Sequence, residues 1–283
     1  MIDYHSKVTF NIDDIKVSYK QKFFLKGLFL LKIFKAKKII TMNPRNPEAQ
    51  YMSVLDGKIV QVGDLNTIKP EGKYELDKSF ENYVLMPGLV EGHSHLFEGA
   101  LWSKLYCGYF DRQKPDGTMS IGIKNVKELV QKLKHENETL LDPNAPLAGW
   151  GLDPIYFDNK ALDRKTLDVV SDQRPIGILH ASGHKLNINS VGLKLAGFLR
   201  TGINHEGLPL GEDGLPSGEI RGAETIALVT RHVGLGKDWL SGDAEGLRNF
   251  GKICARAGVT TAADLANLQT DEAVEMMLQV TSE

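Results

Sequence analysis

The sequence predicts an α/β protein in which parallel strands alternate with helices, preceded by a small all-β region. Two observations predict this class. Short strand-like segments joined by turns fill residues 38–64, and after about residue 86 apolar strands alternate with segments of helical periodicity. The 283-residue chain is 42% hydrophobic and 25% charged, close to the averages of globular proteins, which excludes wholesale disorder.

The all-β region is predicted to form a small antiparallel sheet. It begins with the brief β-branched run KKIITM, which the turn cluster NPRNP follows. The next run, MSVLDGKIVQVGD, is predicted to be a hairpin, because the pair Asp56-Gly57 favours a tight type I′ turn.

A new segment begins with YVLMPGLVEGHSH. Pro87-Gly88 interrupts the apolar run, and Leu89 and Val90 then lead directly into polar residues. This order is typical of a buried parallel strand that emerges at its carboxyl end.

The remainder of the chain is predicted to alternate helices and strands. The run VKELVQKLKHENETLL has helical spacing and is followed by Pro143 and Pro146, which end the helix. Two more strands are expected in PIGILHASGH and in AGVTTAADLA. The other predicted elements are a helix capped by Asn189 or Ser190, an irregular loop at 201–218, helices at 222–233 and 243–257, and a last helix capped by Thr270 or Asp271.

Composition and missing motifs exclude several classes of function. A net charge of −2 gives no electrostatic reason to expect nucleic-acid binding. Two cysteines, Cys107 and Cys254, exclude a disulfide scaffold and suit a reducing compartment, so a cytoplasmic location is expected. The sequence contains no phosphate-binding loop, dinucleotide fingerprint, Cys-x-x-Cys pair or G-x-S-x-G elbow.

No stretch reaches the roughly 18–20 apolar residues of a membrane-spanning helix. The nearest is FFLKGLFLLKIF at residues 23–34, which Lys26 and Lys32 interrupt. We expect an apolar lead-in to the first strand, preceded by a poorly ordered tail. A membrane-surface amphipathic segment, with Lys26, Lys32 and Lys35 facing lipid headgroups, is the alternative.

The sharpest chemical motif is His93-Ser94-His95. Alternate side chains project from one face of a strand, so the two imidazoles are expected to emerge side by side at the strand's end. Neutral imidazole is a common metal ligand, which makes His93 and His95 candidate ligands of a divalent ion. Eight histidines in this length give roughly 0.2 chance pairs at that spacing, so the motif alone leaves metal binding and coincidence open.

Several blocks of the chain resemble the amidohydrolase superfamily. MPGLVEGHSHLFE is similar to that superfamily's metal-binding strand, and the preceding hairpin region is similar to its amino-terminal β-sandwich. Other blocks are similar to the amidohydrolase 3 type, the subgroup that includes N-substituted formamide deformylase: AGWGLDPIYFD, LDVVSDQRPIGILHASGHKLNINSVGLKLAGF, GLPSGEI and AGVTTAADLAN. The resemblance extends from about Ile33 to the last residue.

The resemblance implies a partial (β/α)₈ TIM-type barrel preceded by a small β-sandwich, as in composite, urease-like proteins. The expected domains are an extension at 1–32, possibly disordered, part of the β-sandwich at 33–85, and an incomplete metal-dependent hydrolase barrel at 86–283. A closed barrel needs eight strand–helix units, whereas only about three convincing barrel strands follow Met86. The chain is therefore expected to be an amino-terminal fragment.

The resemblance also implies one or two divalent ions, usually zinc, that activate water for attack on a carbon attached to nitrogen. His93 and His95 would be two of the ligands. The family's other ligands and its proton-shuttling aspartate come from later strands, expected beyond Glu283, so the catalytic residue stays unknown. The expected function is hydrolysis of a non-peptide carbon–nitrogen bond in a small amide or formamide-like substrate, with doubtful activity for this chain alone.

Four further residues are candidates for substrate binding. His180 and His184 close the run PIGILHASGH, and Gly183 is expected to bend the chain between them. Pocket lining, a metal role and structural hydrogen bonding stay open for both, with His184 preferred as a site residue. Trp150 and Asp153 lie in a Gly-flanked segment predicted to be a loop, where ligand contact or loop packing would explain them.

Two acidic residues have open interpretations. Glu219 is explained equally well by helix capping or by a salt bridge. Asp264 ends a predicted strand and either hydrogen-bonds a ligand histidine or caps the next helix. Solvated positions are expected for the remaining histidines, His5, His135, His205 and His232.

Two other classes of function remain as alternatives. The first is a non-catalytic fragment, either an assembly partner or a pseudo-enzyme relic, whose open sheet edge pairs with a second copy or with a separately encoded carboxyl-terminal half. The second is a barrel enzyme without a metal. The expected partners are thus a small-molecule substrate and, for the first alternative, another chain.

Overall fold

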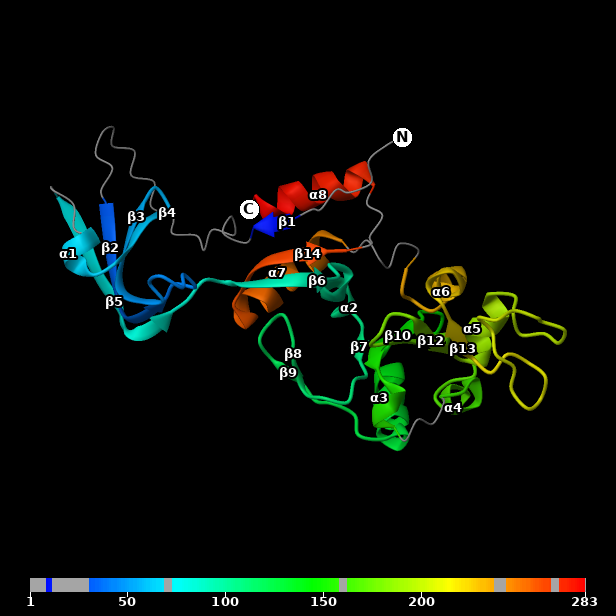
Figure 1. Cartoon of the computed structure of the whole chain (residues 1–283). Coiled ribbons are helices and arrows are strands. Elements are labelled where there is room, and N and C mark those ends of the chain that lie inside the picture. The colour runs from blue at the N-terminus through cyan, green and yellow to red at the C-terminus, as the bar shows by residue number, and fades with distance from the viewer. Residues whose placement is uncertain are drawn as a thin grey trace. The chain divides into compact units, whose positions relative to one another are not determined.

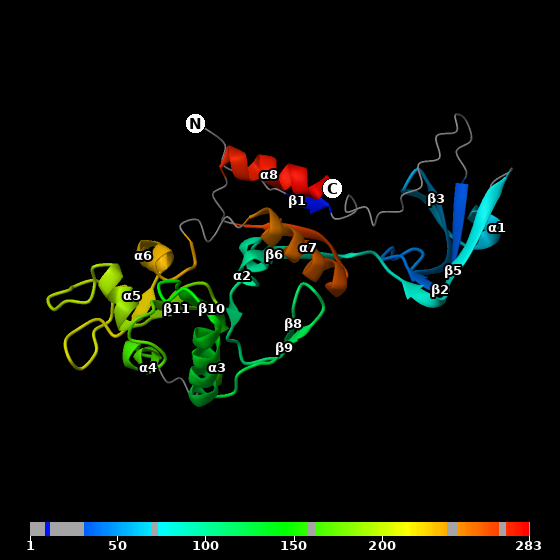
Figure 2. The ribbon, with the colours of Figure 1, turned by 180° about the vertical axis from the view of Figure 1, so that it is seen from behind.

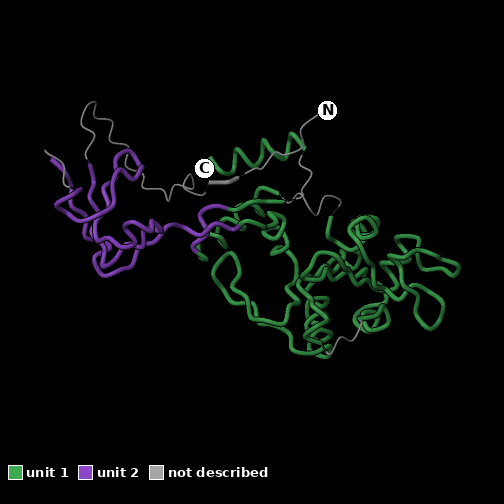
Figure 3. Tube along the Cα trace, in the orientation of Figure 1, with its two compact units in different colours: residues 1–14, 92–257, 262–283 green, residues 15–91, 258–261 purple. Residues whose placement is uncertain are grey.

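The computed structural model describes residues 9–11, 31–68, 73–157, 162–236, 243–265 and 270–282. The chain divides into two compact units (Figure 3). The larger unit contains residues 1–14, 92–257 and 262–283, and the smaller contains residues 15–91 and 258–261. His5 and the greater part of the extension, including the apolar residues 23–30, lie outside the described residues, so the predictions made for them stay predictions.

The smaller unit is built on a four-stranded sheet in the order β4-β3-β2-β5 (Figure 1). Its elements are β2 (Leu31–Ile40), β3 (Glu48–Leu55), β4 (Lys58–Gly63), α1 (Leu65–Ile68) and β5 (Tyr74–Leu85). The predicted hairpin is confirmed, since Asp56 and Gly57 have φ angles of 51° and 75°, both positive as a type I′ turn requires.

The expected antiparallel arrangement of this sheet is wrong at one edge. Strands β2, β3 and β4 are antiparallel neighbours, but β5 runs parallel to β2. The reason is the connection: a tight turn joins β3 to β4, whereas α1 stands between β4 and β5, which lets the chain cross over to the far side of β2. Ala36, Ile39 and Ala49 form the small buried core of the sheet.

The larger unit contains a five-stranded mixed sheet in the order β13-β12-β11-β10-β7, with the following strands: β7 (Leu105–Tyr106), β10 (Leu147–Leu152), β11 (Ile176–His180), β12 (Lys185–Ile188) and β13 (Glu219–Arg221). Strand β10 is parallel to both β7 and β11. The mixed α/β class is therefore confirmed. The expectation of parallel strands is wrong for β12, because a tight turn at Gly183, with φ 70°, returns the chain antiparallel to β11. Strand β12 is also antiparallel to β13 on its other side.

Helices cover both faces of this sheet, and the strand residues alternate between the two cores. Ile176 and Ile178 of β11 pack with Leu129 of α3 (Val126–Thr139) and Leu167 of α4 (Arg164–Asp168), whereas Leu179 packs in a second cluster. That second cluster includes residues of α5 (Ser190–Leu195) and α6 (Ala223–Val229). Figures 1 and 2 show α4 and α6 on opposite sides of the sheet.

Most of the predicted helices are confirmed, including their caps. The side chain of Asn189 accepts from the backbone N–H of Gly192 at the start of α5, and that of Thr270 accepts from Ala273 at the start of α8. Three further helices are α7 (Ala244–Ala257), α8 (Asp271–Thr281) and the 3₁₀ turn η3 (Thr230–His232), which extends α6. Gly258, with φ 73°, follows the last residue of α7, at the end of the helix predicted over 243–257.

The histidine motif lies at the end of β6 (Leu89–Ser94), an edge strand of a three-stranded sheet in the order β1-β14-β6. Strand β6 pairs with β14 (Val259–Asp264), and β14 pairs on its other side with β1 (Thr9–Asn11). The prediction that this strand is buried is wrong, since Leu89 and Val90 are 48% and 70% exposed. An edge strand pairs with a neighbouring strand on one side only. Apolar residues in its sequence therefore do not show that other elements bury it.

Two further observations concern the cysteines and membrane-spanning helices. Cys107 and Cys254 are both buried, and no disulfide joins them. In the described part of the chain, no helix combines the length and the apolar character that crossing a membrane requires. The cytoplasmic location stays a prediction.

Candidate active site

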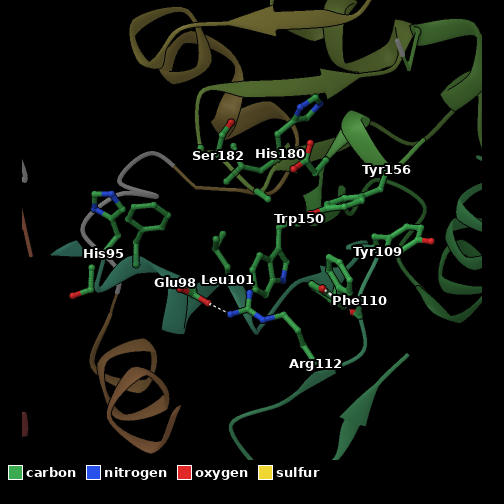
Figure 4. A pocket seen from close by; sticks show the side chains of 18 of the residues that line it. His95, Glu98, Leu101, Tyr109, Phe110, Arg112, Trp150, Tyr156, His180 and Ser182 are labelled. Atoms are coloured by element: carbon green, nitrogen blue, oxygen red, sulfur yellow. Dashed lines mark hydrogen bonds and ion pairs between the residues drawn. The ribbon is translucent and has the colours of Figure 1, made fainter. Parts of the chain in front are cut away.

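The larger unit contains a cavity of about 530 Å³ into which the end of β6 leads (Figure 4). Its wall is formed by residues 93–101, which run from β6 into α2 (Phe97–Leu101), by residues 106–112, by the end of β10 and by the turn after β11. Because β10 and β11 are parallel, their carboxyl ends meet at one edge of the sheet, where α/β proteins form their ligand sites.

His93 and His95 line this cavity side by side. Their ring centroids are 5.3 Å apart and the rings are nearly perpendicular, at 84°. The ring of His95 also stacks on Phe97, with centroids 5.3 Å apart and an interplanar angle of 21°. The expected projection of both imidazoles from one face of the strand end is thus observed.

Asp264 lies beside this pair, at the end of β14. Its Oδ1 atom is 3.5 Å from Nδ1 of His95, and its side chain is 5% exposed, against 44% for that of His95. The helix that follows begins at Asp271 and takes Thr270 as its cap, so Asp264 does not cap it. Of the two open interpretations of Asp264, the structure therefore favours an interaction with the histidine over helix capping. A carboxylate at Nδ1 leaves Nε2 available for a ligand.

The side chains of His93, His95 and Asp264 provide donor atoms that fit part of a divalent-metal site. Two imidazoles with an adjacent carboxylate are groups that zinc and similar ions prefer, but a catalytic zinc usually has three protein ligands. Within the described ranges, no three His, Cys, Asp or Glu side chains are grouped so that they could hold a metal ion. His93 and His95 therefore form an incomplete ligand set.

His180 ends β11 and lines the same cavity, but its ring is engaged in a hydrogen bond. Its Nε2 atom is 2.5 Å from Oδ1 of Asn187, whose Nδ2 donates to the carbonyl of Leu162. Since the amide nitrogen is used, Oδ1 accepts and His180 donates from Nε2. Burial lowers the pKa of His180, and the hydrogen bond to Asn187 offsets this only in part. Local hydrogen bonding and pocket lining therefore both apply to this residue.

The other predicted substrate-binding residues divide between the cavity and the surface. His184 is exposed and is not among the residues that line the cavity, so its role stays a prediction. Trp150 and Asp153 both line it. The predicted loop is wrong for Trp150, which lies buried on β10, where a bulge at Gly151 disturbs the pattern. The carboxylate of Asp153 accepts from the N–H of Ile155, 3.1 Å away.

Glu219 lies outside the cavity, and the salt-bridge interpretation of this residue is confirmed. Its Oε1 atom is 2.5 Å from Nε of Arg221 and 3.5 Å from Nζ of Lys185. Burial raises the pKa of Glu219, but the two cations outweigh that effect and hold the pKa below its ordinary value.

No pattern in the sequence indicated an ion pair in the cavity wall. Nη2 of Arg112 is 2.6 Å from Oε1 of Glu98, and both residues line the cavity (Figure 4). The guanidinium carbon lies 5.8 Å from the ring centroid of Trp102 and 5.6 Å from that of Trp150. These side chains come from separate segments, so only the tertiary fold brings them together.

Comparison with known proteins extends these observations. A model of the amidohydrolase family matches residues 81–283. Protein LONG AFTER FAR-RED 3 of Arabidopsis thaliana is 28% identical over 233 residues, which are 80% of this chain and 37% of that protein. Exoenzymes regulatory protein AepA of Pectobacterium carotovorum subsp. carotovorum is 26% identical over 176 residues, 61% of this chain and 36% of that protein. The chain thus spans about a third of the length of these relatives.

A solved structure shares the fold. The crystal structure of an uncharacterized metal-dependent hydrolase from Pyrococcus horikoshii OT3 superposes with a TM-score of 0.53 at 16% sequence identity. The superposition covers 88% of this chain and 45% of that protein. At this identity the similarity supports the arrangement of strands and helices described above.

Proposed function

This chain belongs to the amidohydrolase family, and on that premise we propose that it is part of a metal-dependent hydrolase of a carbon–nitrogen bond other than a peptide bond. The observation that carries the proposal is the pair of imidazoles of His93 and His95, 5.3 Å apart in the cavity wall, with Asp264 beside the second ring. The name of the structural neighbour, a metal-dependent hydrolase, supports a divalent cofactor. We propose zinc, because imidazole nitrogen suits it.

In this proposal, His93 and His95 hold the ion through ring nitrogens. Asp264 is a positioning residue, which fixes the ring of His95 through Nδ1. When bound, the ion supplies Lewis acidity, which generates a nucleophile from water at neutral pH. The buried indole of Trp150 and the neighbouring aromatic rings keep bulk water from one side of the cavity.

We propose that the other metal ligands and the proton-shuttling carboxylate come from polypeptide outside this sequence. The support is that the curated relatives are about three times as long as the parts that match, and that the ligand set found in the described residues is incomplete. The proposed fold is a partial TIM-type barrel with part of a β-sandwich, and the proposed substrate is a small amide of the N-substituted formamide kind.

A competitive zinc titration tests this proposal. The purified chain is expected to bind zinc weakly, and His93→Ala and His95→Ala are each expected to weaken binding by at least about tenfold, because each removes one of two ligands. His135→Ala, on the exposed face of α3, is the matched control and should leave the affinity unchanged. Equal affinities for all four proteins would contradict the metal assignment.

Activity tests the incompleteness of the site. This chain alone is expected to hydrolyse N-substituted formamides no faster than its His93→Ala variant, since part of the ligand set is missing. Robust, zinc-dependent turnover by the chain alone would contradict the proposal that further ligands come from elsewhere.

The exposed apolar residues of β6 favour a second candidate function, that of an assembly module. Leu89 and Val90 lie on an edge strand and are largely exposed, as they would be on a strand that pairs with another chain. Light scattering distinguishes this candidate: a mass above one subunit that falls on Val90→Lys supports it, and a stable monomer contradicts it.

A further inference from the structure

One hairpin carries the cation of the ion pair in the cavity wall, and α7 holds this hairpin in place. The hairpin consists of β8 (Arg112–Gln113) and β9 (Met119–Ser120). The guanidinium of Arg256, in the last turn of α7, donates to the carbonyls of Lys114 and Pro115 over 2.5 Å and 2.8 Å. Figures 1 and 2 both show the hairpin beside α7. The first residue of the hairpin is therefore positioned from outside the cavity.

The carboxylate of the pair comes from α2, directly after the histidine motif. The backbone N–H of Glu98 donates to the carbonyl of His95 over 3.0 Å, so Glu98 lies within one helical turn of that histidine. Helix α2 packs against α7, the same helix that holds the hairpin. Both members of the pair are thus positioned by contacts with α7.

The pair is accessible to a ligand, although it is partly covered. The side chains of Arg112 and Glu98 are 41% and 33% exposed, and both residues line the cavity. The guanidinium lies within cation–π distance of the rings of Trp102 and Trp150. Figure 4 shows the contact between the two charged side chains set apart from the ring of His95. A ligand in the cavity can therefore reach the pair without displacing the histidines.

A single contact leaves most of the hydrogen-bonding capacity of the pair unused. This contact joins Nη2 of Arg112 to Oε1 of Glu98, 2.6 Å apart. Within the described ranges, Oε2 of Glu98 and the Nε and Nη1 groups of Arg112 have no hydrogen-bond partner. A guanidinium has five N–H donors, and a carboxylate accepts at both oxygens. The pair therefore offers a ligand donors and an acceptor side by side.

The two charges of the pair determine which ligand group fits it best. A carboxylate would be attracted by Arg112 and repelled by Glu98, and an ammonium group would experience the reverse. A carboxamide carries no net charge and presents a carbonyl acceptor beside its N–H donors. It can accept from the guanidinium and donate to the carboxylate, so that each member of the pair gains a partner while the ion pair stays intact.

We infer that the Glu98–Arg112 pair recognises an uncharged carboxamide group of the ligand, other than the amide that reacts. The inference rests on the proposed function for the position of the reacting bond, which lies at His93 and His95. It adds a second point of attachment, which selects substrates by hydrogen bonding and needs no ion.

Nuclear magnetic resonance titration of the whole chain in the presence of EDTA tests the inference, because the pair needs no ion. The probes are hexanamide, hexanoate and hexylammonium, which share their chain length and differ in charge near neutral pH. The parent chain is expected to bind hexanamide more tightly than either charged probe.

Single substitutions should change this preference in opposite directions. Glu98→Gln leaves the guanidinium uncompensated, so hexanoate should bind about three- to tenfold more tightly than it binds the parent chain. Arg112→Gln leaves the carboxylate uncompensated and should favour hexylammonium by a similar factor. Arg112→Lys keeps the cation, so hexylammonium should bind it as weakly as it binds the parent chain. A merely structural role of the pair would instead weaken the binding of all three probes together.

Two control variants separate the pair from a general effect of charge. Glu138→Gln and Arg200→Gln, at exposed positions, should leave all three affinities unchanged. The inference would be overturned if the parent chain bound hexanoate more tightly than hexanamide, if it did not bind hexanamide, or if Glu98→Gln left the affinity for hexanoate unchanged. Failure of zinc binding with this selectivity intact would instead contradict the proposed function alone.

Discussion

A Cβ atom placed on Gly99 would lie 1.9 Å from the carbonyl oxygen of Gly246, so α2 and α7 meet through their backbones. The contact is reciprocal, since a Cβ on Gly246 would lie 2.7 Å from that of Ala100. Helix α2 begins two residues after His95. The close approach of the two helices therefore fixes the direction in which the chain leaves the histidine motif.

The first prediction concerns this helix contact. Gly99→Ala should lower the free energy of unfolding by about 1–3 kcal/mol, because the methyl group has no space and the backbones must separate. Urea denaturation measures the change. Gly92→Ala is the control, since no atom of the described residues lies within 4 Å of the Cβ position at Gly92. Identical unfolding midpoints for the two variants would refute the backbone contact.

The second prediction concerns Asp264. Asp264→Asn removes the negative charge beside Nδ1 of His95 and should weaken zinc binding about 10- to 100-fold, as the loss of a carboxylate partner of a ligand histidine does. Zinc competition titration provides the measurement. Asp172→Asn, at an exposed position, serves as the control. If both variants bind zinc like the parent chain, Asp264 does not orient the histidine.

The third prediction is a pH dependence of stability that arises from His180. Burial lowers its pKa below the ordinary 6.5, so below pH 6.5 the unfolded chain binds a proton that the folded chain does not. The stability from this residue is fully present above pH 6.5 and is lost as the pH falls toward the folded-state pKa. Between pH 7 and pH 5, the free energy of unfolding measured by urea denaturation should fall less for His180→Gln than for the parent chain. Equal losses of unfolding free energy in the two proteins would contradict the conclusion that His180 is buried in its neutral form.

The fourth prediction concerns a buried cation that the sequence did not single out. The guanidinium of Arg174 donates to Oδ1 of Asn137 and to the backbone carbonyls of Asp142, Ala145 and Leu140. Arg174→Met should lower the free energy of unfolding by about 3 kcal/mol, because several partly buried acceptors lose their donor. Arg200→Met, at an exposed arginine, should change it by less than about 0.5 kcal/mol. Similar effects of the two substitutions would contradict this role.

Local signals in the sequence were sufficient to predict the turns and helix caps whose geometry depends on a few neighbouring residues. The Asp56-Gly57 turn and the Asn189 and Thr270 caps depend on side chains and backbone preferences within a few residues, so their positions could be predicted. Strand β10 was missed because the run LAGWGL is buried throughout and bulged at Gly151, which leaves neither alternation nor β-branched residues to reveal a strand.

The candidate site was predictable only in part, because local signals reveal the positions of neighbouring residues but not tertiary contacts. His93 and His95 lie two residues apart on one strand, so their side-by-side projection follows from strand geometry. The Glu98–Arg112 pair and the stacked rings of Tyr109 and Tyr156 depend on how α2, residues 106–112 and η2 (Pro154–Tyr156) come together, and no local pattern encodes that contact. The turn at Gly183 places His180 among the residues that line the cavity and His184 outside them, which no local pattern indicates, and the role of His184 stays a prediction.

The most direct test of the metal assignment is X-ray absorption spectroscopy at the zinc edge on the zinc-loaded chain. Two imidazole ligands are expected at about 2.0–2.1 Å from the ion, and one of them should be lost in each of His93→Ala and His95→Ala. A spectrum without imidazole scattering, or one that neither substitution changes, would contradict the claim that these two histidines hold the ion.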